Sequence, residues 1–104
     1  MKPEELIGCI KSEIEASANL YSKGLSGGTE VGSKIDALCL GSAQREMVVS
    51  LIKQAMEEVT YTLICGLEGE ASVGGGQQQY KLLDGAGNEF SGDLSSIFYE
   101  AVME

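Results

Sequence analysis

Residues 43–65 read AQREMVVSLIKQAMEEVTYTLIC, and this stretch carries the strongest structural signal in the chain. Its apolar residues recur every three or four positions, which is the spacing of one face of an α-helix. Ser42 is a suitable N-cap before the stretch, and Gly66 is a suitable stop after it. We therefore expect a helix about 35 Å long that forms the spine of the domain. Its expected apolar face consists of Val48, Ile52, Ala55, Met56, Val59 and Leu63, widened by Met47, Leu51 and Thr62.

The opposite face of this helix ends in a group of acidic residues. Glu57 and Glu58 lie near the expected C-terminus, where negative charge is unfavourable against the helix dipole. Tyr61 follows one turn after Glu57, and tyrosine is enriched in protein interfaces. The pattern predicts a surface that binds a partner, although a merely solvated helix face would also explain it. The predicted partner-binding residues are Glu57, Glu58, Tyr61, Glu68 and Glu70, and no basic residue lies among them.

A second long helix is expected at residues 3–23. Pro3 suits the first helical position, the acids that follow suit the positive end of the helix dipole, and Gly24 suits the position after the last turn. One apolar stripe runs along this stretch, which predicts that it packs against the spine helix. The stripe consists of Ile7, Ile10, Ile14, Ala18 and Tyr21.

The segment between the two expected helices has a different composition. Residues 24–33 contain four glycines and therefore predict a loop. Residues 34–40 fit either a short helix or a strand, and their apolar spacing suits a helical turn slightly better.

The C-terminal part of the chain predicts a hairpin followed by a helix. Residues 80–83 and 89–91 have the length of two short strands, and residues 84–88 between them are rich in turn formers. Asp93 then opens a last helix as its N-cap. The expected apolar residues of this helix are Leu94, Ile97, Phe98, Ala101 and Val102.

These elements predict an α+β fold in a single domain, residues 1–104. In this fold, two long antiparallel helices carry a β-hairpin and a short C-terminal helix. The alternative is an all-helical bundle in which the hairpin is only an ordered loop. No internal repeat and no linker divides the chain.

The composition excludes several classes of function. Sixteen acidic residues against seven basic ones give a net charge of −9, whereas a nucleic-acid binder needs clustered lysine and arginine. The chain has no histidine, which excludes Ser–His and Cys–His catalysis and histidine metal ligands. We therefore expect no nucleic-acid partner and no histidine-based chemistry.

The sequence also favours a cytoplasmic protein that does not enter membranes. The longest nearly apolar stretch, residues 59–67, is far shorter than the ~20 residues that span a bilayer. The first residues do not have the pattern of a signal peptide. Cys9, Cys39 and Cys65 are widely spaced among apolar neighbours, which predicts buried, reduced thiols.

Two motifs suggest ligand chemistry but match their patterns poorly. The turn at 84–88 offers only Asp84 and Asn88 to the ligand pattern of an EF-hand. The glycine clusters at 26–29 and 74–76 lack the lysine of a P-loop. We therefore expect no catalytic, cofactor-binding or metal site.

The order of motifs in the C-terminal half resembles a known pattern. LICGLEGE at residues 63–70 closes a long helix, YKLLD at 80–84 leads into a glycine turn, and LSSIFYE follows at 94–100. Over residues 45–104 this order resembles small uncharacterised bacterial proteins, some of which look like immunity proteins for contact-dependent toxins. The resemblance implies an inhibitor or immunity-type role, and it carries no site residue over to this chain.

We therefore expect a non-enzymatic, acidic protein-binding module, such as an inhibitor or immunity-type partner of a basic protein. The alternative is a small ligand-binding domain or enzyme that uses the glycine-rich loops and surface carboxylates. A homodimer is slightly favoured, because Met47 and Leu51 widen the apolar face of the spine helix beyond what one neighbour needs.

Overall fold

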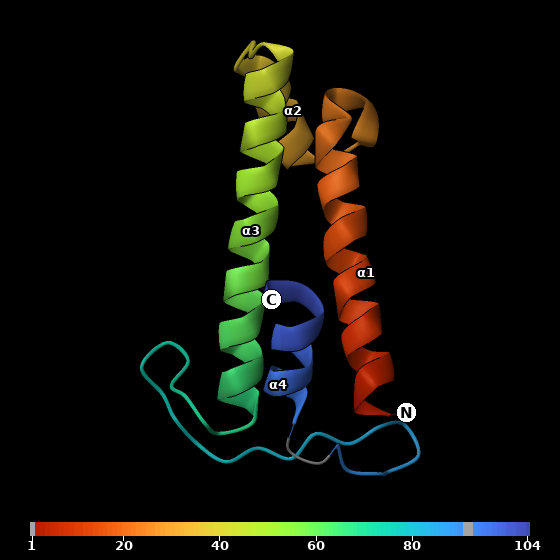
Figure 1. Ribbon diagram of the computed structural model, residues 1–104, viewed down its shortest axis with the longest axis vertical. Helices are drawn as coiled ribbons and strands as arrows, with labels where there is room; N and C mark the ends of the chain where they lie inside the picture. The colour runs from red at the N-terminus through yellow and green to blue at the C-terminus, as the bar shows by residue number, and fades with distance from the viewer. Residues whose placement is uncertain (1, 91–92) are drawn as a thin grey trace. The chain divides into compact units, whose positions relative to one another are not determined.

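The computed structural model describes residues 2–90 and 93–104, most of which are helical (Figure 1). The chain divides into two compact units. Unit 1 consists of Met1–Lys11 and Glu57–Glu104, and unit 2 consists of Ser12–Met56. In chain order the elements are α1 (Pro3–Ser22), the 3-10 helix η1 (Gly24–Gly27), α2 (Glu30–Ala37), α3 (Ser42–Leu67), α4 (Leu94–Phe98) and the π-helix η2 (Tyr99–Met103).

The expected α+β fold is wrong, because the described residues contain helices but no strand. The predicted hairpin is reduced to one isolated bridge between Leu83 and Glu89, beside a hydrogen bond of 2.9 Å from the Phe90 N–H to the Leu82 carbonyl. Ser91, the expected end of the second strand, lies outside the described residues. A two-stranded hairpin alone is only marginally stable. The segment therefore forms an ordered loop, as in the all-helical alternative.

The turn predicted within this loop, at residues 84–88, is confirmed. The Asp84 Oδ1 atom accepts hydrogen bonds from the N–H groups of Ala86 and Asn88, both at 2.9 Å. Gly87 has a φ of 86°, a left-handed conformation that glycine adopts without strain. Asp84 thus holds the turn by its two side-chain hydrogen bonds, and the left-handed conformation explains the glycine.

Helix α1 agrees with its prediction and ends at Ser22, next to the expected end. Its apolar stripe is buried at Ile7 in unit 1 and at Ile14 and Ala18 in unit 2. The predicted helix and its core-facing side are therefore confirmed at these positions.

The loop expected at residues 24–33 is wrong, because η1 and the beginning of α2 occupy this stretch. Thr29 starts α2 by accepting a hydrogen bond from the Gly32 N–H at its Oγ1 atom, at 2.9 Å. Gly32 is buried, and a Cβ there would collide with the Gly24 carbonyl. Glycine thus permits close packing inside a helix here, instead of marking a loop. The undecided segment that follows is helical as far as Ala37.

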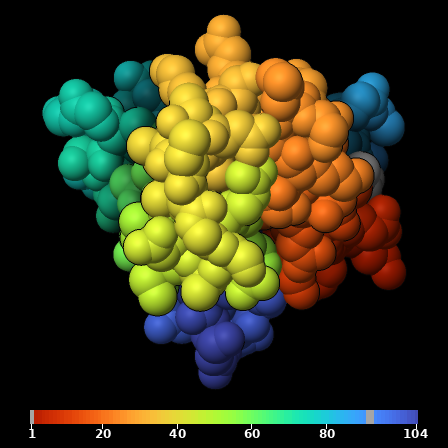
Figure 2. Space-filling view, turned by 90° about the horizontal axis from the view of Figure 1, so that it is seen from above, coloured from red at the N-terminus to blue at the C-terminus, as the bar shows by residue number. Residues whose placement is uncertain are grey.

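Unit 2 is held together by a charged cluster around Arg45. The Arg45 Nη1 atom pairs with Asp36 Oδ1 at 2.6 Å, and Nε and Nη2 both lie 3.4 Å from the Ser22 carbonyl oxygen to which they donate. The Asp36 Oδ2 atom accepts a hydrogen bond of 2.6 Å from the Leu25 N–H. In Figure 2, η1, α2 and the beginning of α3, coloured orange to yellow, form a continuous packed surface. The buried apolar side chains of unit 2 are Ile14, Ala18 and Ile35.

Helix α3 begins and ends differently from its prediction. Ser42 is the first helical residue, and Gly41 takes the N-cap position that the sequence assigns to Ser42. The expected stop at Gly66 is also wrong, because Gly66 lies inside the helix. The helix ends at Leu67, and Gly69 supplies the left-handed residue with a φ of 78°. The N–H groups of Gly69 and its successor donate to carbonyls of the last turn at 3.0 and 3.1 Å, which is a Schellman motif.

The buried arc of α3 differs from the expected one. Ile64 is 5% exposed, whereas Val59, on the expected core face, is 59% exposed. Leu63, Leu51 and Met47 are exposed as well. Apolar residues occupy a wide arc of this helix, so their periodicity alone does not determine which part of the arc is buried.

In unit 1, α4 lies beside the C-terminal half of α3 (Figure 1). Helix α4 begins directly after Asp93, as predicted, and its residues Leu94 and Phe98 are buried, which confirms the predicted apolar side at these positions. The chain continues without a break into η2. The buried apolar side chains of unit 1 are Ile7, Ile64, Leu94 and Phe98.

The expected burial of the cysteines is wrong. Cys9 and Cys39 are exposed, and Cys65 is half-buried. All three are free thiols. Cys9 is next to apolar residues in the sequence, but it does not share their side of the helix, because successive residues of a helix point about 100° apart.

Candidate functional site

The predicted partner-binding residues all lie in unit 1, at the end of α3 and in the turn that follows it. Glu58 and Glu70 are exposed, whereas Glu57, Tyr61 and Glu68 are half-buried. The structure therefore divides the predicted set into accessible acids and residues that take part in packing.

Glu68 is engaged inside the fold. Its Oε2 atom accepts a hydrogen bond from the Leu94 N–H at 2.8 Å, and its Oε1 atom accepts one from the Ser95 N–H at 2.9 Å. Both donors belong to the first turn of α4, whose N–H groups have no partner within the helix. The expected N-cap, Asp93, holds the right position in the chain, but the carboxylate bonded to the helix is that of Glu68.

Tyr61 is also engaged in packing. Its ring is stacked on that of Phe98, with 6.4 Å between ring centroids, and is tilted against that of Tyr99 at 5.7 Å. The neighbouring Cys65 thiol, and after it partial desolvation and the nearby Tyr99 and Glu70, raise the pKa of the Tyr61 hydroxyl above its ordinary 10.0. Through these ring contacts Tyr61 packs the C-terminal helices against α3.

Charge is distributed unevenly between the two units. Unit 1 contains eleven of the sixteen acidic residues and three of the seven basic ones, which gives it a net charge of −8. Unit 2 contains five acidic and four basic residues and has a net charge of −1. The acidic character of the protein is thus a property of unit 1, which holds the predicted site.

The structure adds an exposed apolar feature, of which periodicity alone places Val59 and Leu63 in the core. Val59, Leu63 and Leu67 follow one another at intervals of four residues along α3, and the last two are 46% and 42% exposed. Their spacing is visible in the sequence, but it also fits a buried stripe. Acidic residues precede and follow the three residues in the sequence, and this is the sequence signal that favours a surface position.

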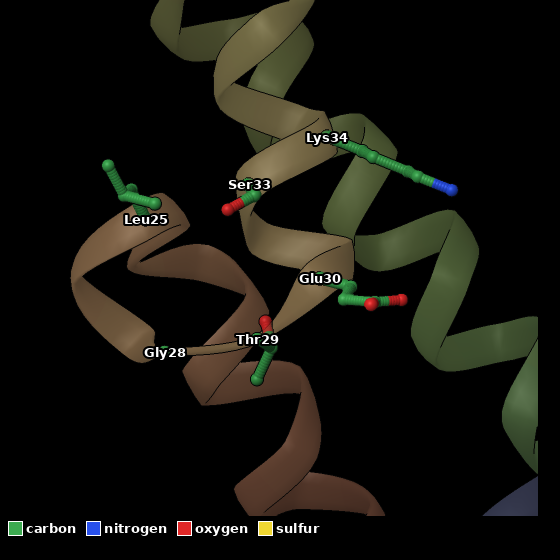
Figure 3. Close-up of a pocket in the computed structure, with 6 residues that line it drawn as sticks. All are labelled: Leu25, Gly28, Thr29, Glu30, Ser33 and Lys34. Atoms are coloured by element: carbon green, nitrogen blue, oxygen red, sulfur yellow. The ribbon is translucent and has the colours of Figure 1, made fainter.

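The hollow drawn in Figure 3 lies in unit 2, between η1 and α2. The side chains of Leu25 and Lys34 extend in opposite directions, and the Glu30 carboxylate points away from Ser33. The Thr29 hydroxyl is already occupied by the cap of α2. These side chains do not converge on one point, so the hollow offers no arrangement for catalysis or for orienting a small ligand.

Metal binding and membrane insertion find no support in the part of the chain that the structure describes. Residues 2–90 and 93–104 contain no group of three or more Cys, Asp or Glu side chains placed to hold a metal ion. No helix in the same ranges is long and apolar enough to cross a membrane.

Comparison with known proteins gives no relative. No protein family model matches the chain, and no curated protein or solved structure is significantly similar to it.

Proposed function

We propose that the protein is a non-enzymatic binding module whose unit 1 recognises a basic protein. The observation that carries this proposal is the concentration of charge: unit 1 has a net charge of −8, and unit 2 has a net charge of only −1. Glu58 and Glu70 are exposed at the end of α3 and are free to meet a partner's lysines or arginines. Glu68 and Tyr61 support this surface from within.

A concentrated negative field acts mainly on the rate of association. It reaches about 10 Å into solvent at 0.1 M salt and steers an oppositely charged protein toward the surface. Such steering raises association rates by roughly 10- to 1,000-fold. An inhibitor or immunity-type protein must capture its target quickly, so this role suits the charge of unit 1.

We also propose a cytoplasmic location. The three cysteines are free, and two of them are exposed, which suits a reducing compartment.

The test uses two matched charge-reversal variants. A tagged chain first captures its partner from a lysate of the native host, and mass spectrometry identifies that partner. Stopped-flow association is then measured at two ionic strengths for the wild type, for Glu58→Lys with Glu70→Lys, and for Glu13→Lys with Glu15→Lys. Both double variants change the net charge equally, but only the first alters unit 1.

The unit 1 variant is expected to associate more slowly and to depend less on salt, and the unit 2 variant is expected to keep most of the wild-type rate. Equal effects of the two variants would mean that only the total charge matters. A partner that is not basic, or an unchanged rate for both variants, would refute the proposal.

A further inference from the structure

Unit 1 presents an apolar strip made up of Val59, Leu63 and Leu67 on α3 and of Val73 in the loop after it. The first three side chains are spaced four residues apart and so lie one above the other along about 12 Å of helix. All four side chains are exposed. A continuous exposed apolar surface on a small domain indicates an interaction surface.

Val73 belongs to the strip because of Gly66. A Cβ at Gly66 would collide with the Val73 side chain, so this valine rests directly on the backbone of α3. Two backbone hydrogen bonds between Val73 and Gly76, at 2.8 and 3.0 Å, fix the valine in place. The strip is therefore a ridge of three side chains with a fourth apolar group held beside it.

Two exposed carboxylates lie close to the apolar strip in the sequence. Glu58 precedes Val59 on α3, and Glu70 lies in the turn after Leu67; both are exposed. Lys81 is the only basic residue in the sequence from residue 57 to residue 104. A second copy of the chain would bring another unit of charge −8 against the strip, and like charges across an interface are unfavourable. The charges therefore favour an occupant that is both apolar and positive.

We propose that the apolar strip binds a basic amphipathic helix of the partner, an inference that rests on the proposed function and specifies the partner's contact element. Such a helix presents apolar residues at intervals of three and four, which match a strip of two helical turns. A ridge of side chains spaced four apart also fits the groove of a second helix. Lysines or arginines of the partner helix then meet the net negative charge of unit 1.

The probe is a synthetic amphipathic helix of leucine and lysine, and its control is a peptide of the same composition with the leucine positions scrambled. Fluorescence anisotropy measures the binding of each labelled peptide to the full chain. The wild type is expected to bind the amphipathic peptide at least about tenfold more tightly than the scrambled one. Val59→Asn with Leu63→Gln is expected to remove this preference.

The matched control is Met47→Gln with Leu51→Gln, which changes two exposed apolar residues of α3 in unit 2. This variant is expected to bind both peptides as the wild type does. Because all four positions are exposed, circular dichroism of both variants is expected to show unchanged helical content.

Each contrary result has a separate meaning. Equal binding of the two peptides by the wild type overturns the helix-docking proposal but leaves a charge-driven function standing. Self-association of the chain that is lost in the Val59 and Leu63 variant overturns it in favour of a second copy. Peptide binding that is insensitive to salt and to Glu58→Lys with Glu70→Lys overturns the proposed function as well. No binding of either peptide also overturns the docking proposal.

Discussion

The Glu68 carboxylate accepts two hydrogen bonds, of 2.8 and 2.9 Å, from N–H groups of helix α4. This helix begins 26 residues further along the chain. Helix α4 has only five residues, and so short a helix is not stable by itself. The two hydrogen bonds and the negative charge at the helix N-terminus therefore stabilise α4. In the sequence, Glu68 is one acid among several, and its two donors are too distant for a local pattern to reveal them.

Loss of this cap is expected to destabilise unit 1. Glu68→Ala should lower the free energy of unfolding by about 1–2 kcal/mol, because two buried N–H groups lose their acceptor. Urea unfolding followed by circular dichroism measures the change. The control is Glu70→Ala at an exposed acid nearby, expected to stay within about 0.5 kcal/mol of the wild type. Equal stability of the two variants would contradict the capping role.

Asp36 makes the stability of unit 2 depend on pH. The hydrogen bond from the Leu25 N–H and the pairing with Arg45 hold the pKa of the Asp36 carboxyl below its ordinary 3.8. A carboxyl with a lowered pKa stabilises the fold above its ordinary pKa, and this stabilisation is lost as the pH falls through the lowered value. The free energy of unfolding is therefore expected to decrease as the pH drops below 3.8.

The Asp36→Asn variant isolates this contribution. It should be less stable than the wild type at neutral pH and should show a weaker loss of stability below pH 3.8. Urea unfolding at a series of pH values compares the two proteins, with Glu13→Gln as a control for an exposed acid of the same unit. Parallel pH curves for wild type and Asp36→Asn would exclude this role.

At the scale of elements, the sequence predicts helices better than it predicts their faces. The extent of α1 follows from periodicity, proline and capping residues, which act locally. Periodicity also locates the body of α3, although its two ends differ from the expected cap and stop. The buried arc of α3 depends on what packs against it, which is α4 in unit 1. Helix α4 follows a loop of more than twenty residues, and its position on α3 is determined by contacts of Tyr61, Phe98 and Glu68. The hairpin failed for a related reason, since good turn chemistry at residues 84–88 does not by itself provide a sheet.

The arc of α3 can be tested with two aspartates. Ile64→Asp places an unpaired carboxylate at a buried position and is expected to lower the free energy of unfolding by about 3 kcal/mol or more. Val59→Asp is expected to change the free energy of unfolding by less than about 0.5 kcal/mol. If Val59 were in the core, this variant would be as destabilising as Ile64→Asp. Thermal melting of both variants decides between the two arcs, and a reversed order would restore the face expected from periodicity.

Two helical glycines are expected to respond in opposite directions to alanine. A Cβ at Gly8 in α1 would point into open space, so Gly8→Ala should stabilise the fold by up to about 1 kcal/mol through helix propensity. A Cβ at Gly32 in α2 would collide with the Gly24 carbonyl, so Gly32→Ala should destabilise the fold despite the same propensity. Chemical unfolding of both variants measures the difference, and stabilisation by both would remove the packing role of Gly32.

At the scale of the whole molecule, the two units differ in electrostatic character, which the total charge of −9 conceals. Most of the excess acid belongs to one unit, and this could be counted only after the units were known, because unit 1 joins residues from both ends of the chain. The predicted site was found by its charge, whereas two residues of its apolar strip, Val59 and Leu63, were assigned to the core. A core position and a surface position for these apolar residues differ in exposure, and no local sequence pattern determines exposure.

A homodimer remains a prediction, and the structure locates the residues to test. Met47 and Leu51 are exposed in unit 2, whose net charge of −1 opposes self-association only weakly. Sedimentation equilibrium at high protein concentration is expected to detect a species heavier than the monomer, and Met47→Glu with Leu51→Glu should abolish it. A purely monomeric wild type would argue against the dimer.

The hydrogen bonds between Glu68 and α4 also bear on where the chain tolerates insertions. Because the carboxylate holds α4 close to the end of α3, the connecting loop influences stability mainly through chain closure, and doubling its length costs only about 0.6 kcal/mol. A side chain at Gly85, in the exposed turn of that loop, would meet open space. We therefore expect that extra residues, such as an epitope or a reporter peptide, can be inserted at this turn while α4 stays packed against α3.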